Sequence, residues 1–319
     1  MHEFHLINKY FYQLAKKNKS SLNLNDDVFF NKSKRLVIST DTYVEGIHFI
    51  DFKKPDLVIK KIIRSSISDI ICKGVKPKYY FISGSGNRNS FSSSNLKKIS
   101  KSLKEEQNKY NIFLSGGDTV YSNKLSFTIT SVGFSQKIIP RNNAKLNDDI
   151  YVTGNLGDSF LGLRILKKNI YSNKKLNRYF ENKYYLPNIQ IKLANKLFLF
   201  ANTSIDVSDG LIADLEKLIN KQKFSYKLKL DNIPISKNLK KILIQKKLNK
   251  IFCISKGDDY QILFTANPSK SRIIYKTAKT LGVKISKIGK ICSKSQKSQI
   301  IDKKGEKIAV KIKGYFHTF

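Results

Sequence analysis

The stretch Arg35-Leu-Val-Ile-Ser-Thr-Asp-Thr-Tyr-Val-Glu-Gly-Ile-His-Phe49 gives the strongest indication of the fold. It begins with a β-branched run that predicts a strand ending in Asp41. The next stretch, 57–72, has apolar residues at helical spacing, and Gly74 predicts where this helix ends. A second strand is expected at 79–82, so the chain opens with a strand, a helix and a strand.

Further elements are expected on both sides of a turn-rich stretch at 140–149. Before it we expect a loop at 83–95, a helix at 95–110, a strand at 112–114, a turn at 115–118 and a strand at 125–134. After it we expect a strand at 150–153, a turn at 154–157 and helices at 159–168 and after Pro187. A turn at 206–210 is expected to open a helix that ends at about residue 220. A strand at 262–265, a helix at 270–281 and short strands beyond complete the expected elements. Alternating elements with some hairpin-like spacings predict an α+β fold. A chain of 319 residues suits two domains, which we expect at 1–138 and 139–319.

The chain is strongly basic, with 60 Lys and Arg against 24 Asp and Glu and a formal net charge of +36. Such a charge is typical of proteins that bind nucleic acids or anionic membranes. The basic residues, however, are nearly all lysines spread along the whole chain, whereas proteins that read bases favour arginine in clusters. We therefore expect a solvated lysine-rich surface and no specific nucleic-acid partner.

The cysteines and the apolar runs indicate a cytoplasmic protein. Cys72, Cys253 and Cys292 are odd in number and far apart, which excludes a disulfide framework and a CxxC metal site. No run of about 18 apolar residues occurs, so no membrane span is expected. The first twenty residues mix charges with aromatics and do not resemble a signal peptide.

Nearly half of the acidic residues are concentrated in short segments, most of which also carry Gly, Ser or Thr. Seven such segments hold eleven of the 24 acids: Asp26-Asp27, Ser39-Thr-Asp41, Ser68-Asp69, Gly116-Gly-Asp118, Asp148-Asp149, Asp206-Val-Ser-Asp209 and Gly257-Asp-Asp259. Several lie at strand ends or helix starts, which are positions that can converge on one ligand site. Carboxylates gathered without a His or Cys cluster favour Mg²⁺, as a nucleotide substrate would require.

Each acidic segment also has a plainer interpretation. Asp206 or Asp209 alone would most often be a helix N-cap, and Asp148-Asp149 a turn. The turn Gly154-Asn-Leu-Gly157 could approach a phosphate or serve close helix–strand packing. No Walker A motif, nucleophile elbow or protein-kinase motif set occurs, so catalysis by a side-chain base or nucleophile has little support and no catalytic side chain is assigned.

Taken in order, these segments resemble the thiamine-monophosphate kinase family over nearly the whole chain. The likeness runs through Asp26-Asp27, Val37–Phe49, Ser68-Asp69, Ser115–Thr119, Ile150–Gly154, Ile205–Leu211, Gly257–Tyr260, Gly314-Tyr315 and His317. Several of these motifs also occur in aminoimidazole ribonucleotide and selenophosphate synthetases. The Asp41–Phe49 segment is the part that indicates the thiamine enzyme.

The resemblance implies a two-domain PurM-like architecture and a homodimer. Residues 1–138 would be the domain that binds ATP and magnesium and forms the dimer, and residues 139–319 would complete the active site. The implied reaction is Mg²⁺-assisted transfer of a phosphoryl group from ATP directly to thiamine monophosphate, giving thiamine diphosphate. It would use several Mg²⁺ ions, with ATP as co-substrate.

The resemblance also implies a role for individual residues. The magnesium ligands would be Asp27, Ser39, Thr40, Asp41, Asp69, Asp118, Asp206 and Asp209. ATP contacts would come from Gly117, Asp118, Arg141 and Ser208, and contacts to the thiamine substrate from His48, Asp258 and Tyr315. An arginine such as Arg141 can clamp a phosphate through two parallel hydrogen bonds.

The chain departs from the family pattern at three places. Asn23 and Asn25 stand where glycines are usual, and Asn tolerates left-handed backbone. Ile71, Cys72 and Lys73 replace the small residues that usually follow Ser68-Asp69, which brings bulk and a charge close to the metal ligands. Asp258 replaces a usual Glu, and Gln261 replaces another.

Two other functions compete with thiamine monophosphate phosphorylation. The first is the activity of another ATP-dependent synthetase of the same superfamily. The other is nucleic-acid binding by a basic protein that keeps an inactive kinase fold. Retention of all eight expected metal ligands argues against the second, and binding that vanishes steeply with salt would mark it as non-specific.

Overall fold

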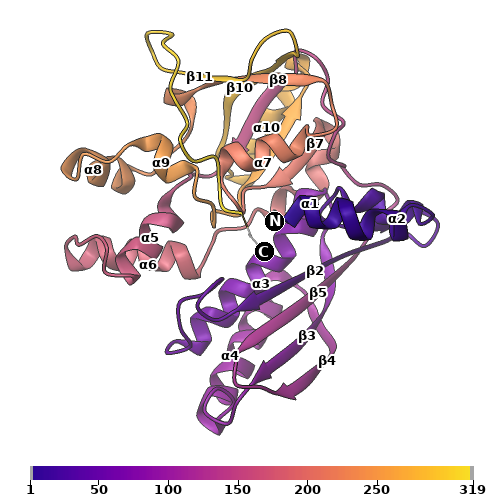
Figure 1. Ribbon diagram of the computed structural model, residues 1–319, viewed down its shortest axis with the longest axis vertical. Coiled ribbons are helices and arrows are strands. Elements are labelled where there is room, and N and C mark those ends of the chain that lie inside the picture. The colour runs from indigo at the N-terminus through magenta and orange to yellow at the C-terminus, as the bar shows by residue number, and fades with distance from the viewer. Residues whose placement is uncertain (1–2, 317–319) are drawn as a thin grey trace.

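The computed structural model describes residues 3–316 and contains two β-sheets flanked by helices (Figure 1). The first sheet has the strand order β1-β2-β5-β3-β4. Its strands are β1 (Phe29–Asn31), β2 (Leu36–Val44), β3 (Pro77–Gly86), β4 (Phe113–Tyr121) and β5 (Ser126–Phe134). All neighbours pair antiparallel except β3 and β4, which are parallel and joined by α4 (Ser93–Tyr110).

The second sheet has the order β11-β8-β10-β6-β9-β7. Its strands are β6 (Asp149–Thr153), β7 (Ala201–Asp206), β8 (Phe224–Lys229), β9 (Ile262–Ala266), β10 (Ile285–Ser293) and β11 (Gln299–Ile301). The helices of this half are α5 (Asp158–Leu166), α6 (Lys174–Tyr185), α7 (Leu211–Leu218), α8 (Lys237–Gln245), α9 (Lys250–Ile254) and α10 (Ser271–Leu281). Short helices α1 (Glu3–Leu6) and α2 (Tyr12–Ala15), separated by a π-helical turn at Ile7–Phe11, precede the first sheet, and a 3₁₀ stretch at Lys19–Leu24 follows α2.

Helix α3 (Pro55–Cys72) connects the two halves of the molecule (Figure 1). Pro55 at its first turn has a backbone already suited to a helix and gives up no hydrogen bond there. Its isoleucines are buried on most sides, because the helix contacts β2 and β5 of the first sheet and also β7 of the second. One hydrophobic core accordingly joins residues of α3, such as Ile62, to Phe264 of β9. The end of α3 that carries Asp69 is thereby held against both sheets.

The predicted α+β class and two-part architecture are confirmed, and most of the predicted elements are present. The turn predicted at 115–118 was wrong, because these residues lie inside β4. Gly117 runs so close to β3 that a Cβ there would lie 1.8 Å from the Ile82 carbonyl oxygen, and pairing with β3 overrides the turn preference. The helix expected after Pro187 is a 3₁₀ stretch at Ile191–Leu199, and α6, α8 and α9 were not predicted. The first sheet ends at Phe134 and the second begins at Asp149, and the boundary at 138/139 stays a prediction.

Candidate active site

Three aspartates from three different elements meet where α3 packs between the sheets. Asp41 lies on β2, Asp69 near the end of α3 and Asp206 at the end of β7. The Ser39 hydroxyl donates to Asp69 Oδ2 at 2.6 Å, and the Ser68 hydroxyl donates to Asp206 Oδ2. We call Asp41, Asp69 and Asp206 the acidic cluster. These three acids were among those that could converge on one ligand site, and the fold brings them together.

The acidic cluster is electrostatically unfavourable when it carries its full charge. Burial raises the pKa of Asp41 to about 6 and that of Asp206 to about 7. Burial, together with the charges of Asp41 and Asp206, raises the pKa of Asp69 well above its usual value. A cation would relieve this repulsion, and carboxylate and hydroxyl oxygens are ligands that Mg²⁺ accepts.

The acidic cluster alone does not form a closed metal cage. Within residues 3–316 no group of three or more His, Cys, Asp or Glu side chains is arranged to hold a metal ion by itself. Mg²⁺ commonly binds through one or two carboxylates and takes its other ligands from water and substrate phosphates, and the carboxylate and hydroxyl oxygens of the acidic cluster are donors of that kind. The cluster therefore fits magnesium that arrives with a nucleotide.

The acidic cluster predicts a pH-dependent stability without metal. The folded-state pKa values of Asp41 and Asp206 lie above the value of about 3.9 expected in the unfolded chain. Between these values the folded state binds more protons, so the free energy of unfolding falls as the pH rises. We expect the unfolding temperature in EDTA to drop from about pH 5 to about pH 8, and Mg²⁺ to reduce the drop. Scanning calorimetry of the wild type and Asp206→Asn measures this effect. Equal slopes for the two proteins would contradict it.

A second charged group surrounds Asp26 and Asp27, which precede β1. The backbone N–H of Arg141 donates to Asp26 Oδ2 at 2.8 Å. The guanidinium of Arg141 donates to both oxygens of Asp27, from Nε to Oδ2 at 3.1 Å and from Nη2 to Oδ1. Lys73 Nζ lies 2.8 Å from Asp26 Oδ1 and 2.7 Å from Asp27 Oδ2. The predicted metal ligand Asp27 and the predicted ATP contact Arg141 are thus ion-paired to each other, with a lysine beside them.

Asp209 and Ser208 lie in the loop between β7 and α7. Neither Asp206 nor Asp209 is the N-cap of α7, whose N-cap position is Gly210, so the N-cap interpretation was wrong. The backbone N–H groups of Asp209 and Gly210 instead donate to Asp214 Oδ2, each at 3.0 Å. Lys217 pairs with both Asp209 and Asp214. Asp148 is buried and accepts from Lys145, Asn202 and Thr265, which confirms its structural role.

Three predicted site residues lie apart from the acidic cluster. Gly117 and Asp118 are on the edge strand β4, separated from β2 by β3 and β5. At a strand spacing of about 4.8 Å this separation is about 14 Å across the sheet. The Thr40 side chain points to the opposite sheet face from Ser39 and Asp41, where its hydroxyl shares a 3.0 Å hydrogen bond with Thr130. The assigned roles of Gly117, Asp118 and Thr40 stay predictions.

The expected thiamine contacts are linked by a buried lysine. Lys61 on α3 is 1% exposed, and its Nζ donates to Asp258 Oδ1 at 2.8 Å and lies 4.0 Å from the centroid of the Tyr184 ring. The Tyr184 hydroxyl donates to the His48 carbonyl oxygen at 3.4 Å, and the Tyr260 hydroxyl donates to Asp258 Oδ1 at 3.0 Å. Asp258 and His48 therefore flank one group of tyrosines around a buried cation.

Tyr315 reaches the same region from the C-terminus. Its backbone N–H donates to the Asp209 carbonyl oxygen at 2.9 Å, while the Asp258 N–H donates to the Ser208 carbonyl oxygen at 2.8 Å. The loop of Ser208 and Asp209 thus holds Asp258 on one side and Tyr315 on the other. His317, part of the family resemblance, lies outside the described residues.

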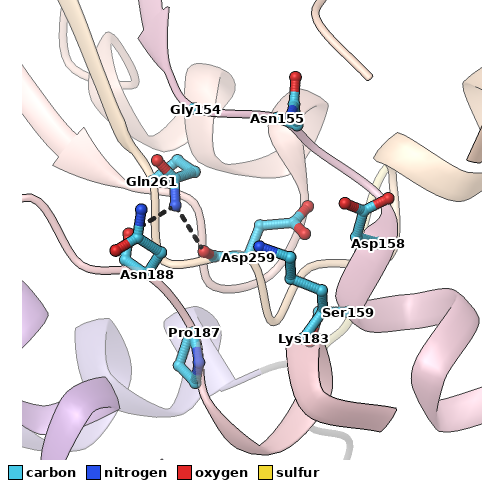
Figure 2. Close-up of a pocket in the computed structure, with 9 residues that line it drawn as sticks. All are labelled: Gly154, Asn155, Asp158, Ser159, Lys183, Pro187, Asn188, Asp259 and Gln261. Atoms are coloured by element: carbon cyan, nitrogen blue, oxygen red, sulfur yellow. Dashed lines mark hydrogen bonds between the residues drawn. The ribbon is translucent and has the colours of Figure 1, made fainter. Parts of the chain in front are cut away.

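A pocket of about 90 Å³ is lined in part by Asp259, the residue after Asp258 (Figure 2). It is lined by Gly154, Asn155, Asp158, Ser159, Lys183, Pro187, Asn188, Asp259 and Gln261. None of these was assigned a ligand, although Asp259 lies in one of the acidic segments and Gly154 in the turn that could approach a phosphate. The volume is small against the roughly 300 Å³ or more of most ligand sites. Asp259 accepts from the Gly157 N–H at 2.7 Å, and a Cβ on Gly154 would lie 2.2 Å from Gln261 Oε1. The glycine turn therefore serves close packing, and the pocket wall fixes the loop that presents Asp258.

Several residues that shape the site were not found from the sequence. They are Lys61, Tyr184, Asp214 and Lys217, and Lys73 was noticed only as a departure. Lys61 and Lys73 did leave a signal, because each is a lysine within or next to the apolar face of a predicted buried helix. A charged residue at such a position must find a buried partner. The partner itself lies far away in sequence and could not be read from it.

The class of protein is indicated first by the N-terminal part of the chain, which carries the first sheet together with Asp41 and Asp69. Residues 25–135 match the family described as AIR synthase related protein, N-terminal domain. A thiamine-monophosphate kinase of Buchnera aphidicola from Acyrthosiphon pisum is 37% identical, with 99% of this chain and 98% of that protein covered. The chain belongs to the thiamine-monophosphate kinase family.

More distant relatives support the same membership. A thiamine-monophosphate kinase of Haemophilus influenzae is 33% identical, covering 92% of this chain and 90% of its own. The solved structure of AaThiL complexed with AMPPCP and TMP superposes with a TM-score of 0.85 at 26% identity, covering 99% of this chain and 97% of the other. Thiamine monophosphate kinase from Aquifex aeolicus gives a TM-score of 0.79 at 25% identity, with 97% and 99% covered.

Proposed function

We propose that this protein phosphorylates thiamine monophosphate with ATP, giving thiamine diphosphate and ADP. The observation that carries the proposal is the acidic cluster, which lies between the two sheets near Arg141. Relatives named thiamine-monophosphate kinase over the full chain, and a similar structure that holds AMPPCP and TMP, support it.

The chemistry requires alignment of two anions and needs no side-chain base. The phosphate of thiamine monophosphate is already a charged nucleophile, so it attacks the γ-phosphorus without losing a proton to the protein. Magnesium bound at the site would neutralise phosphate charge during transfer. Asp41, Asp69 and Asp206, helped by the Ser39 hydroxyl, would hold it. Arg141, which is ion-paired to Asp27, would orient a phosphate.

Recognition of the acceptor would fall to the group around Lys61. Thiamine carries a cationic thiazolium and an aromatic aminopyrimidine, which suit a carboxylate and aromatic faces. Asp258 would offer the carboxylate and the partly buried Tyr260 a ring, and His48 and Tyr315 are the other expected contacts.

A coupled assay that follows ADP tests the proposal directly. Purified protein is supplied with ATP, Mg²⁺ and one acceptor at a time: thiamine monophosphate, thiamine or an unrelated phosphomonoester. We expect turnover with thiamine monophosphate alone. A better rate with unphosphorylated thiamine would overturn the phosphate-to-phosphate reaction and point to another superfamily activity.

We also propose a homodimer formed through the first sheet. Every residue of its edge strand β4 is exposed, including Phe113, Leu114, Val120 and Tyr121. Exposed apolar side chains along an unpaired strand edge are typical of an association surface. In Figure 1, α3 and α4 cover one face of this sheet, and β4 forms its outer border.

Tyr121→Glu is expected to convert the dimer to monomer. Tyr121 is 72% exposed on β4, and a carboxylate there would be buried against its copy at a cost that a dimer contact cannot offset. Tyr275→Glu is the matched control, since Tyr275 is 71% exposed on α10. Light scattering after gel filtration measures the mass. A dimeric Tyr121→Glu protein, or loss of the dimer in both variants, would contradict this interface.

The last expectations concern membranes, nucleic acids and cellular location. Among residues 3–316 the structure contains no helix of the length and apolarity that crossing a membrane requires. A cytoplasmic location stays a prediction from the sequence, and so does the expectation that the protein has no specific nucleic-acid partner.

A further inference from the structure

Lys73 is a fully buried cation whose three donor positions are all used. Its side chain is 0% exposed, and its Nζ contacts Asp26 Oδ1, Asp27 Oδ2 and the carbonyl oxygen of Ser204, the last at 2.9 Å. The contacts come from the segment before β1 and from β7. Lys73 itself is the C-cap residue that directly follows α3. An ammonium at this junction therefore joins three separate parts of the chain.

The oxygens of both aspartates are occupied by protein donors. Asp26 Oδ1 accepts from Lys73 and from the Asp27 N–H at 2.8 Å, and Asp26 Oδ2 accepts from the Arg141 N–H. Asp27 Oδ1 accepts from Arg141 Nη2, and Asp27 Oδ2 faces both Lys73 and Arg141 Nε. Mg²⁺ needs oxygen ligands in a near-octahedral shell at about 2.1 Å. The predicted ligand Asp27 does not fit that requirement while Lys73 and Arg141 hold its oxygens.

We propose that the Lys73 ammonium is a tethered cation that takes the place of a divalent ion at Asp26 and Asp27, so that Asp27 positions Arg141 and does not bind magnesium. The positive charge is present at every magnesium concentration. It also acts beyond its direct partners, because it opposes the rise in the pKa of Asp69 and of Asp206. The acidic cluster keeps its proposed magnesium role, and the site binds one ion fewer than it would if Asp27 were also a magnesium ligand.

A small side chain at position 73 would leave the two aspartates without their shared cation. Lys73 supplies that charge without dissociating. The idea rests on the proposed function only in taking magnesium to bind at the acidic cluster.

Counting Mn²⁺ ions by electron paramagnetic resonance tests the proposal. The probe is MnCl₂ added to full-length protein with AMPPCP and thiamine monophosphate, for the wild type, Asp27→Asn and Lys73→Met. We expect Asp27→Asn to bind as many ions as the wild type and Lys73→Met to bind one more. Loss of an ion in Asp27→Asn, or an unchanged count in Lys73→Met, would overturn the proposal. Should Lys73→Met not fold, the Asp27→Asn count still decides.

Thermal unfolding without substrates gives an independent measure. In EDTA, Lys73→Met should unfold at a lower temperature than the wild type, and Mn²⁺ should restore more of that loss than it adds to the wild type. Lys61→Met is the matched control, because Lys61 is equally buried but pairs with the single carboxylate of Asp258. Its loss should not be restored by Mn²⁺. Equal restoration in both variants would contradict the metal replacement. A failed phosphorylation assay would reject the proposed function and leave these ion counts standing.

Discussion

Asp69→Asn is expected to lower the rate of thiamine monophosphate phosphorylation by about 10³-fold or more. Asp69 lies between Ser39 and the charges of Asp41 and Asp206, so its carboxylate is central to any cation held there. Asn has nearly the same shape but no charge, and the proposed magnesium would be lost or misplaced. Steady-state kinetics over a range of Mg²⁺ concentrations measures the effect.

The fold of Asp69→Asn should remain intact. Removing one of three mutually repelling carboxylates leaves the free energy of unfolding in EDTA near pH 8 equal to or above that of the wild type. Asp231→Asn is the matched control, because Asp231 lies on the surface, away from the acidic cluster, with Lys303 at 4.0 Å. Near-normal turnover by Asp69→Asn at limiting Mg²⁺ would show that the acidic cluster does not bind the essential metal.

Asp258→Asn is expected to raise the KM for thiamine monophosphate by about 10-fold or more and to leave the KM for ATP nearly unchanged. Asp258 provides the carboxylate of the proposed acceptor site, while the ATP contacts are assigned to other residues. Its backbone has a positive φ of 63°, a conformation that Asn tolerates, so the loop should persist. Asp258→Glu keeps the charge and should recover much of the lost affinity.

Asp258→Asn also changes stability, which has to be separated from binding. It removes the charge that pairs with buried Lys61, a loss of up to about 3 kcal/mol in the free energy of unfolding. Kinetics should therefore be measured well below the unfolding temperature of the variant. Equal increases in the KM for ATP and for the acceptor would reject the assignment of Asp258 to the acceptor.

A pair of aromatic substitutions tests the C-terminal border of the same site. Tyr315→Ala should raise the acceptor KM because its ring is assigned to the thiamine, whereas Phe316→Ala is the adjacent control. The two side chains are similarly exposed, at 46% and 39%. Similar kinetics for both variants would remove Tyr315 from the acceptor site.

The convergence of Asp41, Asp69 and Asp206 could be predicted because each follows a recognisable local signal. Asp41 ends a β-branched run, Asp69 lies in a long apolar helix, and Asp206 precedes a helix start. Asp41 nevertheless lies inside β2 and not at its end, and the three acids meet because α3 packs against both β2 and β7. The ligand roles assigned through the family resemblance stay predictions, and the structure adds that Thr40, Gly117 and Asp118 lie away from this cluster.

The sequence by itself determined the α+β class, most helices and strands, the family and the small set of acids around which a site could form. These properties depend on periodicity, turn chemistry and residue type, which act over a few neighbouring positions. Only the tertiary structure decided which charges neutralise one another. The partners of Lys61 and Lys73 lie as far along the chain as Asp258 and Ser204, and no local rule connects positions so far apart. A buried lysine must find an acceptor, and which one it finds depends on how α3 packs against both sheets.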